Sequence, residues 1–177
     1  MNDRFRWWAD AQQYPRELVD AVLAPPARTG DLANVAQRLR VLHELWQDEA
    51  RRAAVLFPAG KVMERTGRIV ASAKKDGAGD AVTDPSKFAA PEEQALWKIW
   101  TTVKAATTQH LQQQDYAAAT ATYGTLYPSL AQFFEKVFIM DENLDVRRNR
   151  LALMRDIYDL YANVVGDLSK LPLPNDL

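Results

Sequence analysis

The chain has 177 residues, no cysteine, 47 % hydrophobic and 25 % charged residues, and a formal net charge of −1. This length supports a hydrophobic core without disulfides or metal. The absence of cysteine excludes disulfides and thiolate zinc sites and fits a cytoplasmic protein. No apolar run reaches membrane-spanning length, so we expect no membrane partner. A net charge near zero means that any RNA contact must come from a local basic patch or from a larger assembly.

The N-terminal half predicts a series of helices. Pro15 suits the start of a helix, because its fixed φ is already helical and its missing N–H is not needed there. Asp31 can accept the unpaired N–H groups at the start of the following helix. A further helical region is expected from about residue 48 to residue 73, with a break at residues 57–60, where the sequence reads Phe-Pro-Ala-Gly.

The second half continues the helical pattern. The stretch Asp76–Asp80 is rich in glycine and aspartate and predicts a loop. Pro91 opens a long amphipathic helix, Asp115 is placed to cap the next one, and Gly124 with Pro128 forces a break after it. No stretch alternates convincingly at period two. The sequence therefore predicts an all-α fold, a single helical bundle over residues 1–177.

Residues 133–171 are the most informative part of the chain. Asp145 is placed to cap a long last helix, whose apolar residues recur at three-, four- and seven-residue spacings. Arg147, Arg148 and Arg150 crowd its first turn, where the helix dipole disfavours cations. This arrangement indicates either an anionic ligand or pairing with the acidic turn that precedes the helix.

The residues needed for catalysis are scarce. His43 and His110 are the only histidines, and neither has an acidic partner at metal-binding spacing. No serine has the context of a nucleophile elbow, and there is no cysteine nucleophile. Acidic pairs stand at helix starts, where the dipole explains them. We therefore expect no catalytic or metal site within these 177 residues.

Several phrases resemble one known family. FFEKVFIM, RRNRLALM and DLSKL, in this order, look like the end of the beta subunit of bacterial glycyl-tRNA synthetase. That end is an anticodon-binding domain of the DALR type, a helical domain shared with arginyl-tRNA synthetase. YPRELVDAVLA and VTDPSKFAAPEEQALW follow the same family's order. The resemblance covers essentially the whole chain and is strongest in the main motif region, residues 115–171.

The resemblance implies a role in glycine–tRNA ligase. A separate alpha subunit would hold ATP, Mg and glycine, while this domain would bind the tRNA anticodon stem-loop beside the remaining domains of the beta subunit. No cofactor is expected in this domain itself.

Basic residues beside aromatic ones are the candidates for RNA contact. An RNA loop offers phosphates to arginine and splayed bases for stacking and edge hydrogen bonds. One of Phe133 and Phe134 is expected in the core, and Asn149 is expected to be a buried hydrogen-bonding residue. The RNA-binding candidates are Lys61, Arg65, Arg68, Phe134, Lys136, Arg147, Arg148 and Arg150.

An alternative interpretation is a protein–protein interaction module of the same ancestry that does not bind tRNA. The net charge near zero, Glu64 within the basic helix, and Trp7 and Trp8 near the N-terminus support it. The two interpretations predict different surfaces. An RNA binder should place its arginines from the two clusters, 65–68 and 147–150, along one groove. An interaction module should pair those arginines internally and expose an apolar patch.

Overall fold

The computed structural model describes residues 2–73 and 81–175, and within these residues the backbone forms helices joined by turns, without a strand. The predicted all-α class is therefore confirmed. The predicted loop Asp76–Asp80 lies outside the described residues. None of the described helices is both long enough and apolar enough to cross a bilayer.

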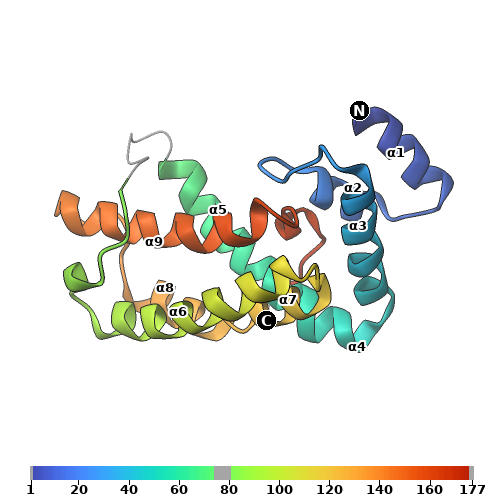
Figure 1. Ribbon diagram of the computed structural model, residues 1–177. Helices are drawn as coiled ribbons and strands as arrows, with labels where there is room; N and C mark the ends of the chain where they lie inside the picture. The colour runs from blue at the N-terminus through green and yellow to red at the C-terminus, as the bar shows by residue number, and fades with distance from the viewer. Residues whose placement is uncertain (1, 74–80, 176–177) are drawn as a thin grey trace.

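The helices of the N-terminal half gather at one end of the molecule (Figure 1). The Asp31 carboxylate accepts the backbone N–H groups of Ala33 and Asn34 at 3.0 and 3.2 Å, so the predicted cap is confirmed. The elements of this half are α1 (Asn2–Ala11), α2 (Arg16–Leu23), α3 (Leu32–Gln47), α4 (Glu49–Arg51) and the π-helical turn η1 (Arg52–Leu56).

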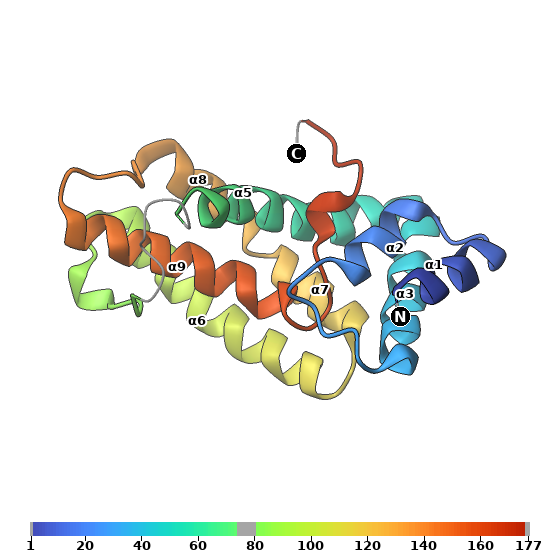
Figure 2. The same cartoon turned by 90° about the horizontal axis from the view of Figure 1, so that it is seen from above.

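Three long helices, α5, α6 and α9, run along the length of the molecule, and α3 lies across one end (Figures 1 and 2). Helix α5 packs against α9 and α7, and α6 packs against α7 and α8. Pro91 begins α6, and Asp115 caps α7 through Ala118 N–H, both as predicted. The elements are α5 (Phe57–Ala73), η3 (Pro85–Lys87), α6 (Pro91–Gln112), α7 (Tyr116–Gly124), α8 (Tyr127–Lys136), α9 (Leu144–Ala162) and η4 (Leu168–Lys170).

The predicted break at residues 57–60 is wrong, because the chain stays helical there. The irregularity lies one turn earlier, where the Phe57 N–H donates to the Arg52 carbonyl as in a π-helix. Pro58 has no N–H and its ring would crowd the carbonyl four residues before it. A wider turn before proline relieves this crowding without ending the helix.

The predicted cap at Asp145 is also wrong. Helix α9 begins at Leu144, and the Asn143 side chain accepts the N–H groups of Asp145 and Val146 at 3.0 and 3.4 Å. Asparagine serves as well as aspartate at this position. Asp145 instead lies in the first turn, where its charge still suits the helix dipole.

One connected hydrophobic cluster contains buried side chains from α1 through η4. A buried arginine reinforces it. The Arg38 guanidinium on α3 donates to the carbonyls of Val164, Val165 and Arg28 at 2.7, 2.8 and 2.6 Å. Because these carbonyls follow α9 or precede α3, Arg38 fixes the N-terminal helices to the end of α9.

Gly166 is placed where a side chain does not fit. Its φ is +138°, and a Cβ there would lie 2.2 Å from the Ala21 carbonyl oxygen. Gly166→Ala should therefore lower the free energy of unfolding by about 3 kcal/mol, measured by urea denaturation. Gly30→Ala is the matched control, since a Cβ there meets no heavy atom within 4 Å, and it should change stability by less than about 0.5 kcal/mol. Equal losses in the two variants would contradict this account of Gly166.

Candidate nucleic-acid interface

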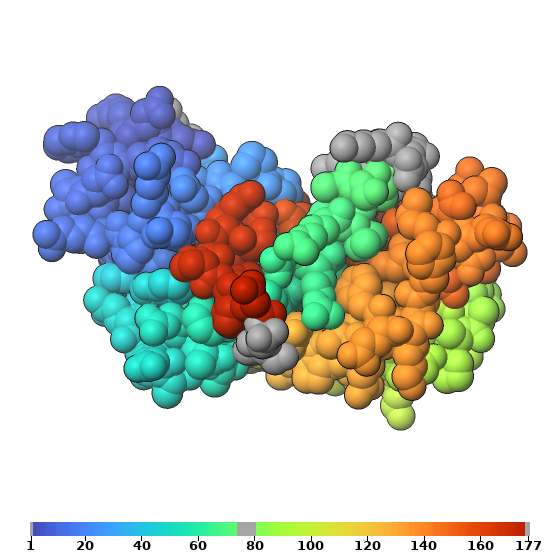
Figure 3. All heavy atoms as spheres, turned by 180° about the vertical axis from the view of Figure 1, so that it is seen from behind, coloured from blue at the N-terminus to red at the C-terminus, as the bar shows by residue number. Residues whose placement is uncertain are grey.

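The outer face of α5 carries two arginines that solvent can reach. The Arg68 side chain is 76 % exposed, with Nη2 2.7 Å from Glu64 Oε1. The Arg65 guanidinium lies over the ring of Tyr127, at the start of α8, 5.4 Å from its centroid. Figure 3 shows α5, in green, on one face of the molecule between the red C-terminal segment and the orange region of α8 and the start of α9. This face therefore presents cations between two flanking elements.

Lys61 belongs to the same helix but is buried, and its Nζ lies 3.0 Å from Glu64 Oε2. Glu64 thus holds Lys61 with one oxygen and Arg68 with the other. Because Lys61 is buried, its charge takes part in the ion pair with Glu64 on α5. Arg68 keeps most of its surface open to a ligand.

The end of α8 divides its aromatic residues between core and surface. Phe133 is fully buried, as expected for one of the pair, and the half-buried Phe134 packs edge-on against it with ring centroids 5.6 Å apart. The sequence analysis missed Phe138, which is 74 % exposed between the buried Val137 and Ile139. The signal for it was the local alternation of an extended segment, in which every second side chain points the same way.

Basic residues precede and follow this exposed phenylalanine in the sequence, and Lys136 and Arg148 keep a large exposed fraction. Lys136 Nζ lies 3.5 Å from Glu92 Oε1, with 65 % of the Lys136 side chain exposed. Arg147 Nε donates to the Asp141 carbonyl at 2.8 Å, and Arg148 is exposed. Lys136, Phe138 and Arg148 therefore place two cations and one aromatic ring in or beside the turn that joins α8 to α9.

Arg150 lies inside the protein. It is 6 % exposed, and its Nε and Nη2 donate to the two carboxylate oxygens of Glu93 at 2.8 and 3.2 Å. Nη1 donates to the Phe138 carbonyl at 2.7 Å and to Asp141 Oδ2 at 2.9 Å. Because its side chain is buried, Arg150 does not line a surface groove. A groove lined by Arg65, Arg68, Arg147 and Arg150 together is therefore not formed.

Electrostatics favour this ion pair in its charged form. Burial raises the pKa of Glu93, but hydrogen bonds from Arg150 and from the N–H groups of Ala89 and Ala90 outweigh burial, so its pKa lies below the usual value. Asn143 N–H and Arg150 lower the pKa of Asp141. The hydrogen bond to Glu93 raises the pKa of Arg150.

Asn149, next to Arg150, is buried and makes two hydrogen bonds with the Asp84 backbone. Its Oδ1 accepts from Asp84 N at 2.6 Å, and its Nδ2 donates to Asp84 O at 2.9 Å. The prediction that Asn149 is a buried hydrogen-bonding residue is confirmed. This contact attaches the segment before η3 to α9.

The two histidines lie on α3 and α6. His43 is half-buried, and its ring packs edge-on against Tyr14 with centroids 4.9 Å apart. His110 is half-buried near the end of α6. In the part of the chain that the structure describes, no three His, Asp or Glu side chains are grouped to hold a metal ion.

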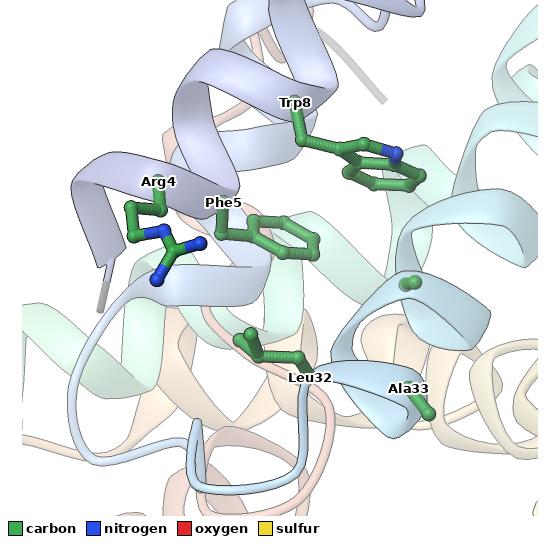
Figure 4. A pocket seen from close by; sticks show the side chains of 6 residues that line it. Arg4, Phe5, Trp8, Leu32 and Ala33 are labelled. Carbon is green, nitrogen blue, oxygen red and sulfur yellow. The ribbon is translucent and has the colours of Figure 1, made fainter.

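A separate apolar hollow of about 740 Å³ lies between α1 and the start of α3. Phe5 and Trp8 project from α1 toward Leu32 and Ala33 (Figure 4). Beside it, Trp7 is 76 % exposed. This surface is the apolar patch that the alternative interpretation anticipates.

Removing Arg150 should be costly, because Glu93 would be left buried without its cation. Arg150→Ala should lower the free energy of unfolding by about 3–5 kcal/mol in chemical denaturation. The neighbouring exposed Arg148→Ala is the matched control and should change it by less than about 0.5 kcal/mol. A small effect of Arg150→Ala would show that the pair adds little to the fold.

The lowered pKa of Glu93 makes the pair sensitive to acid. A carboxyl whose folded pKa lies below its unfolded value, here near 4.5, contributes stability that is complete above that value and is lost as pH falls through the folded pKa. The free energy of unfolding should therefore fall between about pH 5 and pH 3, and fall less steeply in Glu93→Gln. Urea denaturation across this range measures both slopes, and identical slopes would rule out this contribution of Glu93.

Comparison with known proteins identifies related sequences. The chain is 30 % identical over 162 residues to the glycine–tRNA ligase beta subunit of Anaeromyxobacter dehalogenans, covering 90 % of this chain and 21 % of that protein. It is 31 % identical over 158 residues to the beta subunit of Trichlorobacter lovleyi, covering 89 % of this chain and 21 % of that protein. The chain thus spans about a fifth of the length of the curated relatives it matches. The resemblance to this subunit is confirmed.

A family model for the DALR anticodon binding domain matches residues 61–165. The match begins in α5 and ends just after α9, so it starts well before the main motif region at residues 115–171. It includes Arg65, Arg68, Phe138 and Arg148. Since the match covers more than half of the chain, the protein belongs to the DALR anticodon binding domain family.

Proposed function

We propose that this chain binds the anticodon stem-loop of a glycine tRNA and so helps glycine–tRNA ligase to recognise its tRNA. The observation that carries the proposal is the family match over residues 61–165, within which α5 carries the exposed Arg68 and the half-buried Arg65. The beta-subunit relatives supply the link to glycine. The chain would contribute binding energy, and the chemistry would take place elsewhere.

The roles of the exposed residues follow from their chemistry. Arg68 and Arg65 can meet phosphates of the loop, because a planar guanidinium binds phosphate with two parallel hydrogen bonds. Phe138, exposed on the α8–α9 turn, is suited to stacking on an unpaired base. Lys136, at the end of α8, and Arg148, near the start of α9, would hold phosphates of the loop. The proposal therefore assigns phosphate contacts to residues of α5 and to Lys136 and Arg148, and base stacking to Phe138.

The partners that we propose beyond the tRNA are the remaining domains of the beta subunit and the alpha subunit, with ATP and Mg held outside this chain. The compartment that fits this role is the cytoplasm. Interaction without RNA binding has two observations in its favour. One is the internal pairing of Arg150 with Glu93 and Asp141, and the other is the exposed Trp7 with the hollow beside α1. That surface is equally compatible with a place inside a larger ligase, so it does not oppose RNA binding.

The proposal predicts salt-dependent binding of the chain to a glycine-tRNA anticodon stem-loop. In a fluorescence titration at several salt concentrations, the Arg65→Ala/Arg68→Ala double variant should bind more weakly. Its slope of log affinity against log salt should be shallower by roughly 0.7–0.9 for each phosphate that the variant no longer neutralises. Phe138→Ala should lower affinity roughly tenfold and leave the slope unchanged, because stacking releases no counterions.

Arg40→Ala is the matched control, because Arg40 is exposed on α3 outside the family match. It should bind as the wild type does. Absence of binding even at low salt would reject the proposed function, and equal weakening by Arg40→Ala would reject the surface assigned here.

A further inference from the structure

A second hollow, of about 380 Å³, lies at the edge of the same α5 face, between α5, α9 and η4. Arg68 and Ala71 line it from α5, Tyr158 from α9, and Lys170 from η4. Gly67 allows the Tyr158 ring to approach α5 closely, because a Cβ at this glycine would lie 2.9 Å from Tyr158 Cε2. The hollow is thus walled by an aromatic side chain packed against the helix that carries the exposed Arg68.

The wall of this α5–η4 hollow is rich in hydrogen-bond acceptors. The buried Asp167 carboxylate lines it and accepts from Tyr158 Oη at 3.1 Å and from Ser169 N–H at 3.0 Å. The Tyr158 proton is directed to Asp167, so its oxygen lone pairs remain available to accept. Glu64 adds a second carboxylate. A carboxylate has about four acceptor positions, so both acids keep capacity for a ligand.

Cations stand at the rim of the α5–η4 hollow. Lys170 is exposed, and the Arg68 side chain is 76 % exposed. A ligand that suits both the acceptor-rich wall and the cationic rim carries hydrogen-bond donors on one edge and a negative charge beside that edge. A nucleotide whose base bears an exocyclic amino group has this combination, since carboxylates accept from such amino groups and cations bind the phosphate.

We propose that the α5–η4 hollow takes one base of the RNA loop by its amino group, whose two N–H bonds donate to two of the acceptors Asp167, Tyr158 and Glu64. Arg68 and Lys170 hold the phosphate of the same nucleotide. The inference rests on the proposed function and locates base selection within it. Glycine codons have guanine at their first two positions, so the two anticodon bases that pair with these positions are cytosines. Cytosine offers an N4 amino group to carboxylates, whereas uracil presents a carbonyl oxygen that they repel.

The test fills the hollow without disturbing the core. Ala71 is exposed on α5 and lines the hollow, so Ala71→Leu places a larger side chain in it. Ser72→Leu is the matched control, because Ser72 is the next residue on the same helix and is exposed without lining the hollow. Both variants and the wild type are titrated with a glycine-type stem-loop and with two stem-loops that each carry one anticodon cytosine changed to uracil. Circular dichroism checks that the variants stay folded.

The wild type should bind the unchanged loop about tenfold more tightly than one of the uracil loops. Ala71→Leu should bind the unchanged loop about tenfold more weakly than the wild type does, and should no longer distinguish it from that uracil loop. Ser72→Leu should behave as the wild type. Lys170→Ala should weaken binding to both loops equally and reduce the salt slope.

Two results would overturn the inference while leaving the proposed function in place. One is salt-dependent binding in which the wild type binds cytosine and uracil loops equally. The other is discrimination that Ala71→Leu retains in full. Absence of binding to every loop by the wild type would instead remove the proposed function, and the base-binding hollow with it.

Discussion

The buried pair of Arg150 and Glu93 is the constraint on which one end of the molecule depends. Glu93 Oε2 also accepts hydrogen bonds from the N–H groups of Ala89 and Ala90. The carboxylate that neutralises Arg150 therefore also binds the backbone that leads into α6. Arg150 in turn holds the Phe138 carbonyl and Asp141 of the α8–α9 turn. Desolvating two charges is expensive, and only such complete hydrogen bonding offsets it. The geometry of α6, the turn and α9 is therefore set together.

This constraint has a consequence for the surface. Because Arg150 binds the Phe138 carbonyl, the backbone of the turn is fixed at the residue whose ring points to solvent. In the stacking role proposed for Phe138, a ring on a fixed backbone loses less conformational entropy on binding than a ring on a mobile one. The net charge of −1 is compatible with RNA binding, because the total does not describe where the charges lie. Arg68, Lys136 and Arg148 are exposed although the chain as a whole is nearly neutral.

Local signals in the sequence were sufficient for much of the fold. Asp31, Pro91 and Asp115 mark helix starts because capping and proline geometry involve neighbours within three residues. At α9 the same reasoning predicted Asp145 as the cap, but Asn143 is the capping residue. The error arises because two suitable residues lie close together in the sequence. The burial of Arg150 could not be predicted in this way. Its carboxylate partner lies 57 positions earlier in the chain, and only the packed helices bring the two together.

Glu64 shows how the same residue can support opposite interpretations. In the sequence it breaks a basic helix and counts against RNA binding. In the structure it holds Lys61 and Arg68 with its two oxygens and also lines the α5–η4 hollow. A helix face carrying only cations would attract any phosphate backbone, because phosphate contacts carry no sequence information. An acid among those cations reduces that general attraction and adds an acceptor that can distinguish bases. The presence of Glu64 is therefore more compatible with a surface that distinguishes between RNA sequences, as proposed, than with a surface that attracts any phosphate backbone.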